Sequence, residues 1–308
     1  MPLKITVYNN KSAQNMSRIG ESELILNPDG SVYHLKLKPE ELARDIIVVG
    51  DPGRVGTVSK HFDRIEITRQ NREIVTHTGF IGSKRLTVLS TGMGTDNIDI
   101  VLNELDALVN IDLEKREIKT GHTSLNIIRL GTSGALQAGI PVDSVVASTH
   151  GIGLDGMLYY YKDLAKVLDR EITEAFIAQT AWPGVFPRPY AVAASPELLA
   201  HIGKGYLTGM TATAPGFYGP QGRILRLATT HPDLNQAIAG VEIAGRKVLN
   251  FEMETSALYG LGKMLGHHTL TVCAIVANRV EKKYSKDYHP VIEALISDVL
   301  EKLISLPR

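Results

Sequence analysis

Two arginines and a glycine-rich turn form the first group of residues in this sequence that could bind an anion. The motif Gly50-Asp-Pro-Gly-Arg54 follows a β-branched run, which predicts a strand-to-helix turn with free backbone N–H groups and a guanidinium. Arg129 lies in the apolar run 125–130, where a guanidinium is costly unless an anion or a carboxylate pairs with it. We interpret Arg54, Arg129 and Thr132 as an anion site. The alternatives are a solvated Arg54 on a Pro-Gly turn and a structural ion pair of Arg129.

A pair of carboxylates forms the second group. Glu252 and Glu254 flank Met253 where a helix is predicted over 254–265. One carboxylate can lie at the amino end of this helix, where the helix dipole favours negative charge, while the other points elsewhere. Helix capping is the simple explanation, but the neighbouring Met and Phe offer an apolar wall typical of a sugar pocket that accepts hydroxyl hydrogen bonds.

An aromatic loop forms the third group. Phe217 can stack on a planar ring, and Gln221 and Arg223 offer hydrogen-bond donors and an acceptor to ring carbonyls and nitrogens. The histidines show no metal-hydrolase spacing, so we interpret His231 and the pair His267-His268 as structural or solvated.

Repeated strand–turn–helix patterns must position these groups. Apolar runs at 45–50, 86–90 and 125–130 each precede a Gly-rich turn, at 50–53, 91–94 and 131–134. Further strands are expected at 206–213 and 270–277, and an amphipathic helix at 291–304. The pattern predicts an α/β fold with three layers, α/β/α, around a central mixed, mostly parallel twisted sheet. Ligands then bind near the turns at the strand ends.

The composition excludes several classes of function. Lys plus Arg and Asp plus Glu both number 33, so no global basic field attracts nucleic acid or an anionic membrane. A single cysteine, Cys273, and the lack of a signal-peptide or membrane-spanning run favour a cytoplasmic protein without a disulfide framework. Residues 1–31 are expected to form a loosely structured arm before one domain over 32–308, and the charged stretch 111–123 a solvated excursion.

Seven motifs in order resemble the nucleoside phosphorylase family over about residues 32–305: GDPGRV, NREIVTHTG, STGMG, RLGTSGAL, FYGPQGR, NFEMETSAL and VANR. The FYGPQGR loop is similar to the uracil-recognition loop of members that act on uridine. Asn278-Arg279 stands where purine-specific members usually carry an Asp. The resemblance therefore implies reversible phosphorolysis of uridine to uracil and ribose 1-phosphate in pyrimidine salvage. Inorganic phosphate is the co-substrate, and no cofactor is expected.

The resemblance also implies a role for each matching residue. Arg223, Gln221 and Glu254 would be catalytic. Phosphate would be bound by Gly50, Arg54, Arg129 and Thr132 with Arg72 from a neighbouring subunit, ribose by Met253, Glu254 and His34 lent across a dimer, and the base by Phe217, Gln221 and Arg223. Family members also hold a monovalent cation at the dimer interface through the Glu that Glu73 matches, although their Ser aligns with Asn97 here. The implied assembly is a homo-oligomer, a dimer at minimum and a ring-like hexamer by family resemblance.

Three alternatives remain open at this point. They are a phosphorylase of purine or methylthio-nucleosides, a nucleosidase that needs no phosphate, and a non-catalytic nucleoside-binding protein. The sequence leaves open which of uridine, deoxyuridine and thymidine is preferred. Three segments depart from the family pattern and carry no assigned role: the arm, 111–123 and 154–161.

Overall fold

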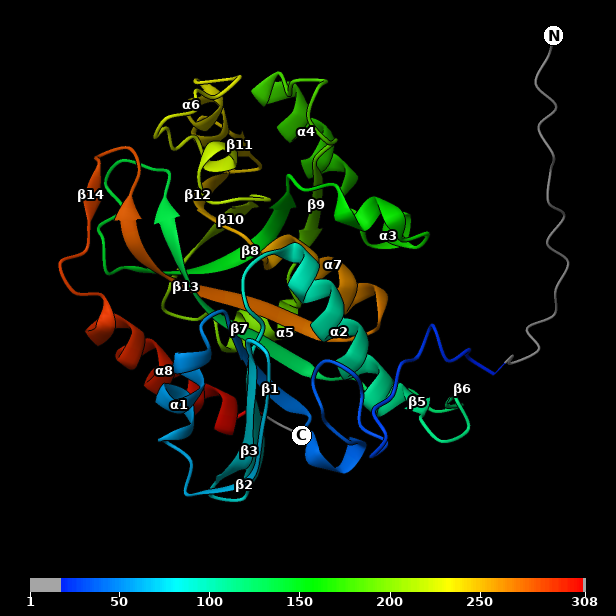
Figure 1. Ribbon diagram of the computed structural model, residues 1–308. Helices are drawn as coiled ribbons and strands as arrows, with labels where there is room; N and C mark the ends of the chain where they lie inside the picture. The colour runs from blue at the N-terminus through cyan, green and yellow to red at the C-terminus, as the bar shows by residue number, and fades with distance from the viewer. Residues whose placement is uncertain (1–17, 307–308) are drawn as a thin grey trace, which may run out of the picture.

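A large mixed sheet dominates the computed structural model, which describes residues 18–306 (Figure 1). Its 12 strands run in the order β11-β12-β10-β8-β13-β7-β1-β4-β3-β2, with β9 on β8 and β14 on β13. Their bounds are β1 (Asp45–Val49), β2 (Arg64–Asn71), β3 (Ile74–Ile81), β4 (Lys84–Ser90), β7 (Asn126–Ala135), β8 (Val145–Gly153), β9 (Tyr190–Ala193), β10 (Leu207–Thr213), β11 (Glu242–Ile243), β12 (Arg246–Glu252), β13 (His268–Asn278) and β14 (Lys283–Tyr284).

Parallel pairing prevails at the centre of this sheet. β1 pairs in parallel with β4 and β7, β7 with β13, and β10 with β8 and β12. The β13–β8, β2–β3 and β3–β4 pairs are antiparallel. All five residues of β1 are buried, as expected for a β-branched strand covered on both faces.

Helices cover both faces of the sheet. In Figure 1 the sheet runs between α1 and α8 on one side and α2 and α7 on the other, so the predicted α/β/α layering is confirmed. The α-helices are α1 (Pro52–Ser59), α2 (Thr95–Asn110), α3 (Leu164–Val167), α4 (Arg170–Thr180), α5 (Pro196–His201), α6 (Leu234–Ala239), α7 (Thr255–Met264) and α8 (His289–Ile304), and the short 3₁₀ helices are η1 (Pro39–Glu41), η2 (Met157–Tyr160) and η3 (Gly219–Gln221). None of the helices among residues 18–306 has the length and apolar character needed to cross a membrane.

One predicted turn is wrong. The segment 131–134 continues strand β7 and pairs with β13, where Gly131 faces Cys273 and Thr132 faces Ala274. Gly131 allows a close approach here: a Cβ on it would lie 2.2 Å from Nη1 of Arg129 and 2.8 Å from Sγ of Cys273. The glycines of 131–134 therefore mark close packing within the sheet and not the turn that the sequence predicted.

The three segments that depart from the family pattern have definite structure where they are described. Residues 111–118 form a small antiparallel pair, β5 (Ile111–Asp112) with β6 (Glu117–Ile118). Ile19 N donates to Arg116 O at 2.8 Å, which joins the end of the predicted arm to this pair. Residues 1–17 of the predicted arm lie outside the described residues. In the segment 154–161, η2 follows Asp155, whose carboxylate accepts a hydrogen bond from the Tyr190 hydroxyl.

Candidate active site

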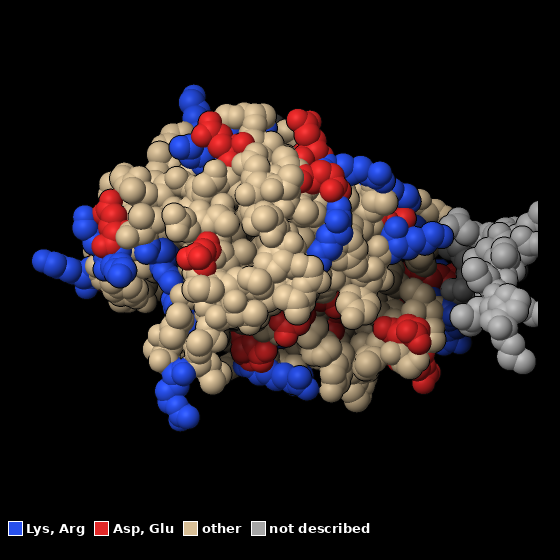
Figure 2. Space-filling view, turned by 90° about the horizontal axis from the view of Figure 1, so that it is seen from above, with Lys and Arg blue, Asp and Glu red and all other residues tan. Residues whose placement is uncertain are grey.

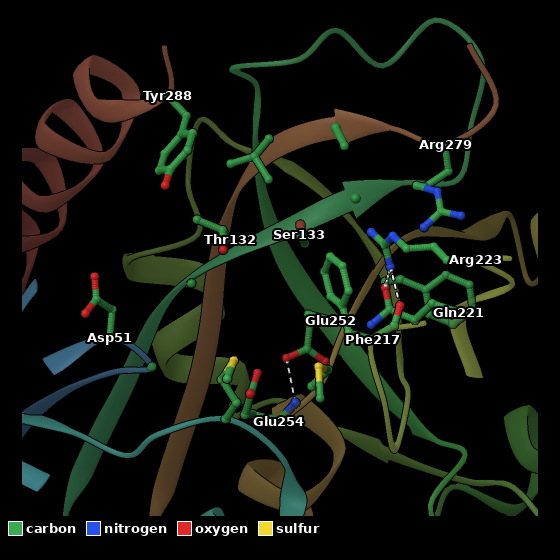
Figure 3. Close-up of a pocket in the computed structure, with 18 of the residues that line it drawn as sticks. Asp51, Thr132, Ser133, Phe217, Gln221, Arg223, Glu252, Glu254, Arg279 and Tyr288 are labelled. Atoms are coloured by element: carbon green, nitrogen blue, oxygen red, sulfur yellow. Dashed lines mark hydrogen bonds between the residues drawn. The ribbon is translucent and has the colours of Figure 1, made fainter. Parts of the chain in front are cut away.

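A cavity of about 1230 Å³ lies at the carboxyl ends of the central strands (Figure 3). Most residues that the sequence singled out line it: Gly50, Arg54, Glu73, Arg129, Thr132, Phe217, Gln221, Arg223, Met253 and Glu254. Figure 3 shows the base-loop residues at one end of this cavity, the two glutamates at its floor, and Asp51 at the opposite end. Tertiary structure thus brings the three groups of candidate residues into one space.

The anion end is built by the turn after β1. Asp51 caps helix α1, and its side chain accepts a hydrogen bond from Gly53 N at 2.9 Å. Arg54 is in the first turn of α1, and its Nη1 lies 3.4 Å from the Leu130 carbonyl oxygen, which it donates to. Burial is the main cause that lowers the pKa of Arg54; Asp51 opposes this shift, and the positive charge of Arg129 adds to it. A bound anion would relieve the repulsion between the two guanidinium groups.

Arg129 forms a buried ion pair with both glutamates. Its Nη1 lies 3.2 Å from Glu252 Oε2, and its Nη2 contacts Glu254 Oε2. All three residues are buried. Burial alone would lower the pKa of the Arg129 guanidinium, but the carboxylates of Glu254 and Glu252 outweigh this effect and raise it. The ion-pair alternative for Arg129 is therefore correct, and the same arginine also lines the cavity.

The two glutamates divide their roles at the start of α7. Glu252 accepts hydrogen bonds from the backbone N–H of Glu254 at 2.9 Å and of Thr255, and from the Thr213 hydroxyl at 2.8 Å, so it caps the helix. Glu254 accepts a hydrogen bond from Gly94 N at 2.8 Å, just before α2. As expected, one carboxylate lies at the amino end of the helix and the other points elsewhere, toward Gly94, and both also contact Arg129. Burial raises the pKa of Glu254, against the lowering effect of Arg129.

The base loop is held together by Arg223. Its Nη1 donates to Gln221 Oε1 at 2.6 Å and to Phe217 O at 2.7 Å, and its guanidinium carbon lies 3.7 Å from the centre of the Phe217 ring. Gly222 has φ of 66°, which ends η3 and turns the chain toward Arg223. The Gln221 oxygen is engaged, so its amide N–H₂ remains to donate to a ligand. Burial, and next the charge of Arg279, lower the pKa of Arg223 to about 10.

Arg279 is a lining residue to which the sequence assigned no binding role. It follows β13, and its Nη1 is buried without a hydrogen-bond partner among residues 18–306. The VANR motif marked its position at a strand end, but a motif does not show which way a side chain points. Ser133 and Tyr288 also line the cavity.

His34 and Arg72 do not line this cavity within the described chain. His34 Nδ1 lies 2.6 Å from Glu104 Oε1, and its carbonyl oxygen accepts a hydrogen bond from Asn71 Nδ2 at 2.9 Å. Arg72 is exposed in the turn between β2 and β3, next to Asn71. The two residues expected to serve a neighbouring subunit therefore lie outside the chain's own cavity, and Asn71 links the segments that carry them.

Glu73 lines the cavity although its neighbour Arg72 does not. It lies close to Asn97 across Gly92: a Cβ on Gly92 would meet Asn97 Nδ2 at 2.5 Å and Glu73 Cγ at 3.1 Å. Asn97 Nδ2 donates to Met93 O at 3.1 Å, so its amide oxygen remains as an acceptor beside the Glu73 carboxylate.

A separate cluster joins α2 to the start of β13. Asp106, His122 and His267 bring potential ligand atoms within 4.8 Å of one another. Leu125 N donates to His267 Nδ1 at 3.3 Å, so the proton of the neutral ring is on Nε2, which lies 3.3 Å from Asp106 Oδ1. A protonated Nε2 has no lone pair for a metal, and within residues 18–306 this buried nitrogen forms no hydrogen bond.

Comparisons with known proteins agree with this geometry. Residues 44–304 match the family model described as the phosphorylase superfamily. The chain belongs to the phosphorylase superfamily. A solved structure of a Trypanosoma brucei nucleoside phosphorylase, described as showing uridine phosphorylase activity, superposes with a TM-score of 0.83 at 34% identity, over 92% of this chain and 100% of that chain. The predicted membership of the nucleoside phosphorylase family is thereby confirmed.

The curated relatives of this chain include uridine phosphorylases and purine nucleoside phosphorylases. The uridine phosphorylase of Thermococcus kodakarensis is 30% identical over 84% of this chain and 81% of that protein, and the uridine phosphorylase of Haemophilus influenzae is 27% identical over 89% and 95%. A DeoD-type purine nucleoside phosphorylase of Bacillus cereus is 28% identical over 79% of this chain and 85% of that protein.

Proposed function

We propose that this protein is a uridine phosphorylase, a pentosyltransferase that converts uridine and phosphate to uracil and ribose 1-phosphate, reversibly, in pyrimidine salvage. The observation that carries the proposal is a single cavity in which the Arg129–glutamate cluster lies between an anion end with Arg54 and a base loop with Gln221 and Arg223. The names of the relatives from Thermococcus and Haemophilus support it.

The anion end supplies the nucleophile. Breaking the glycosidic bond to N1 makes the ribosyl carbon cationic and the departing uracil anionic. Phosphate held by Gly50, Arg54, Arg129 and Thr132 lies next to the sugar carbon and balances its positive charge. A phosphate oxygen forms the new bond to C1′ as the bond to N1 breaks, and the bonding electron pair leaves with uracil, which then takes up a proton.

The carboxylate cluster binds the ribose. Glu254 has one oxygen toward Gly94 N and the other toward Arg129, and its remaining lone pairs accept hydrogen bonds from ribose hydroxyls. Met253 provides the apolar wall beside it. Arg129 contacts the ribose-binding Glu254 and also lines the space for phosphate, so it sets the position of the nucleophile relative to the sugar.

The base loop stabilises the leaving group. Arg223 fixes the Gln221 amide through its oxygen, which turns the N–H₂ donors toward the ligand. Negative charge on departing uracil collects on its carbonyl oxygens, and the Gln221 amide with the free N–H groups of Arg223 donates to them. Phe217 offers its ring for stacking at the same end of the cavity.

A neighbouring copy of the chain completes the site in this proposal. His34 contacts Asn71, the chain neighbour of Arg72, and neither His34 nor Arg72 lines the chain's own cavity, as expected of residues that reach into a partner's site. We propose a homo-oligomer with a dimer as its minimal unit and a hexamer as its full assembly, in the cytoplasm. A monovalent cation near Glu73 and Asn97 is part of the same proposal.

The test follows the absorbance of uridine with purified protein, with and without inorganic phosphate, and identifies the sugar product. Uracil and ribose 1-phosphate should form only with phosphate. Cleavage without phosphate would instead indicate a nucleosidase. No cleavage of uridine, together with turnover of inosine or adenosine, would favour the purine alternative. Binding of all these nucleosides without turnover would indicate a non-catalytic protein.

A further inference from the structure

A second cavity, of about 770 Å³, lies beside the base loop. Gly222, Arg223 and Asn235 line both cavities, so the two share a wall. Its volume falls in the range of small-molecule sites, about 300–1,000 Å³. The catalytic proposal makes no use of this space.

Aromatic side chains form the walls of the second cavity. Trp182 and Phe186 have ring centroids 5.7 Å apart, and Phe186 meets His231 edge-on at 5.1 Å. The indole N–H of Trp182 donates to Pro187 O at 2.9 Å, which fixes the ring in place. The rings are tilted by 60° and 79° to one another, so they offer both faces and edges, and aromatic ligands can pack on either.

An exposed apolar segment borders the same cavity. Leu225 and Leu227 line it and are 77% and 83% exposed. Figure 2 shows this end of the molecule from above, where uncharged side chains cover much of the surface between the charged ones. Covering these leucines with a ligand would remove apolar surface from water.

The charged and polar side chains that line the second cavity indicate which polar groups its ligand carries. Arg223 and Arg226 line the cavity, and none of its lining residues in the described part of the chain is Asp or Glu. Asn235 Nδ2 donates to Gln221 O at 2.9 Å, which fixes the amide, while Asn235 Oδ1 is buried without a partner among residues 18–306. The cavity therefore offers a cation to an anionic group and an unsatisfied acceptor to a hydroxyl.

We propose that this cavity is a second ligand site, which takes a planar aromatic acid carrying a hydroxyl group. The carboxylate pairs with Arg226, the rings lie between Trp182 and the leucines, and the hydroxyl donates to Asn235. The proposal goes beyond the proposed function and needs no turnover.

A ligand in the second cavity would also affect the base loop, because neighbouring residues line the two cavities. Tyr218 lines the second cavity and Phe217 the first, and their rings meet edge-on with centroids 5.2 Å apart. A ligand that displaces Tyr218 would therefore move Phe217 too.

Fluorescence provides a direct test, because Trp182 is the single tryptophan of the chain. The full-length protein is titrated with 6-hydroxy-2-naphthoate, and N-acetyltryptophanamide corrects for absorption by the probe. We expect saturable quenching at one equivalent per chain that persists in saturating uracil. Displacement by uracil would place the probe in the base pocket and overturn the proposal, as would non-saturable quenching.

Two comparisons test the chemistry of the site. Arg226→Gln should weaken binding about tenfold, because a charge-assisted hydrogen bond is lost, while Arg64→Gln, on distant β2, should leave it unchanged. 2-Naphthoate, which lacks the hydroxyl, should bind more weakly than the hydroxy acid. Equal affinities across these variants and probes would refute the assigned contacts. If the protein binds the probe as expected but does not cleave uridine, the second ligand site is supported and only the proposed function is contradicted.

Discussion

Replacing Arg129 with methionine tests the buried cluster most directly. Arg129 is 5% exposed, and Glu252 and Glu254 are 4% and 3% exposed, so the variant leaves two carboxylates buried without a counter-charge. Both keep backbone hydrogen bonds, from Thr255 and from Gly94, but these do not neutralise charge. Removing one partner of a buried pair typically costs about 3–5 kcal/mol. We expect a loss of this size in the free energy of unfolding at pH 8.

The loss should depend on pH with a definite sign. Without Arg129, the folded-state pKa of Glu254, already raised by burial, rises further above its unfolded value. Such a group stabilises the folded state below its unfolded pKa, and this contribution is lost as pH rises through the folded pKa. The deficit relative to wild type should therefore shrink as the pH is lowered from 8 toward 5.

Urea unfolding at one fixed protein concentration measures this deficit at both pH values. Arg188→Met is the matched control, because it removes a surface pair with Glu174 whose side chains are 53% and 63% exposed. The control should lose at most about 1 kcal/mol. A loss in Arg129→Met no larger than in the control, or one that is the same at both pH values, would refute the assignment of a charge-neutralising role.

Three further predictions concern the same cavity. Arg223→Ala should lower kcat for uridine phosphorolysis about 10²-fold, since it removes a donor to the leaving group; near-normal turnover would contradict that role. Gly131→Ala should destabilise the protein by about 1–3 kcal/mol and lower turnover, because the new Cβ would lie 2.2 Å from Arg129 Nη1. Gly121→Ala is the control, since Gly121 has open space around it, and it should change neither stability nor turnover in the same urea and kinetic assays. Burial raises the pKa of Cys273 to about 11, so iodoacetamide at pH 8 should label it only after unfolding, as mass spectrometry would show.

Much of the fold was predictable because its signals are local. The β-branched run of β1, the Asp51 cap of α1 and the amphipathic face of α8 each depend on residues near one another in the chain. The prediction of a turn at 131–134 was wrong because glycine has two uses in a sheet protein. It breaks strands, and it also allows close packing within them, and only the neighbours from β13 and Arg129 distinguish these cases.

The sequence by itself determined the family, the layered sheet and the residue types that a nucleoside and phosphate require. The partners of Arg129 were decided by tertiary structure, since Glu254 is 125 residues away along the chain. Pairing of β12 with β7, which places Asn250 opposite Ala135, brings the glutamates to the arginine. The second cavity likewise arises from segments near 154, 182–187 and 215–235 that meet only when the chain folds. Local patterns specify elements, whereas charge pairing and cavities depend on which distant elements pack together.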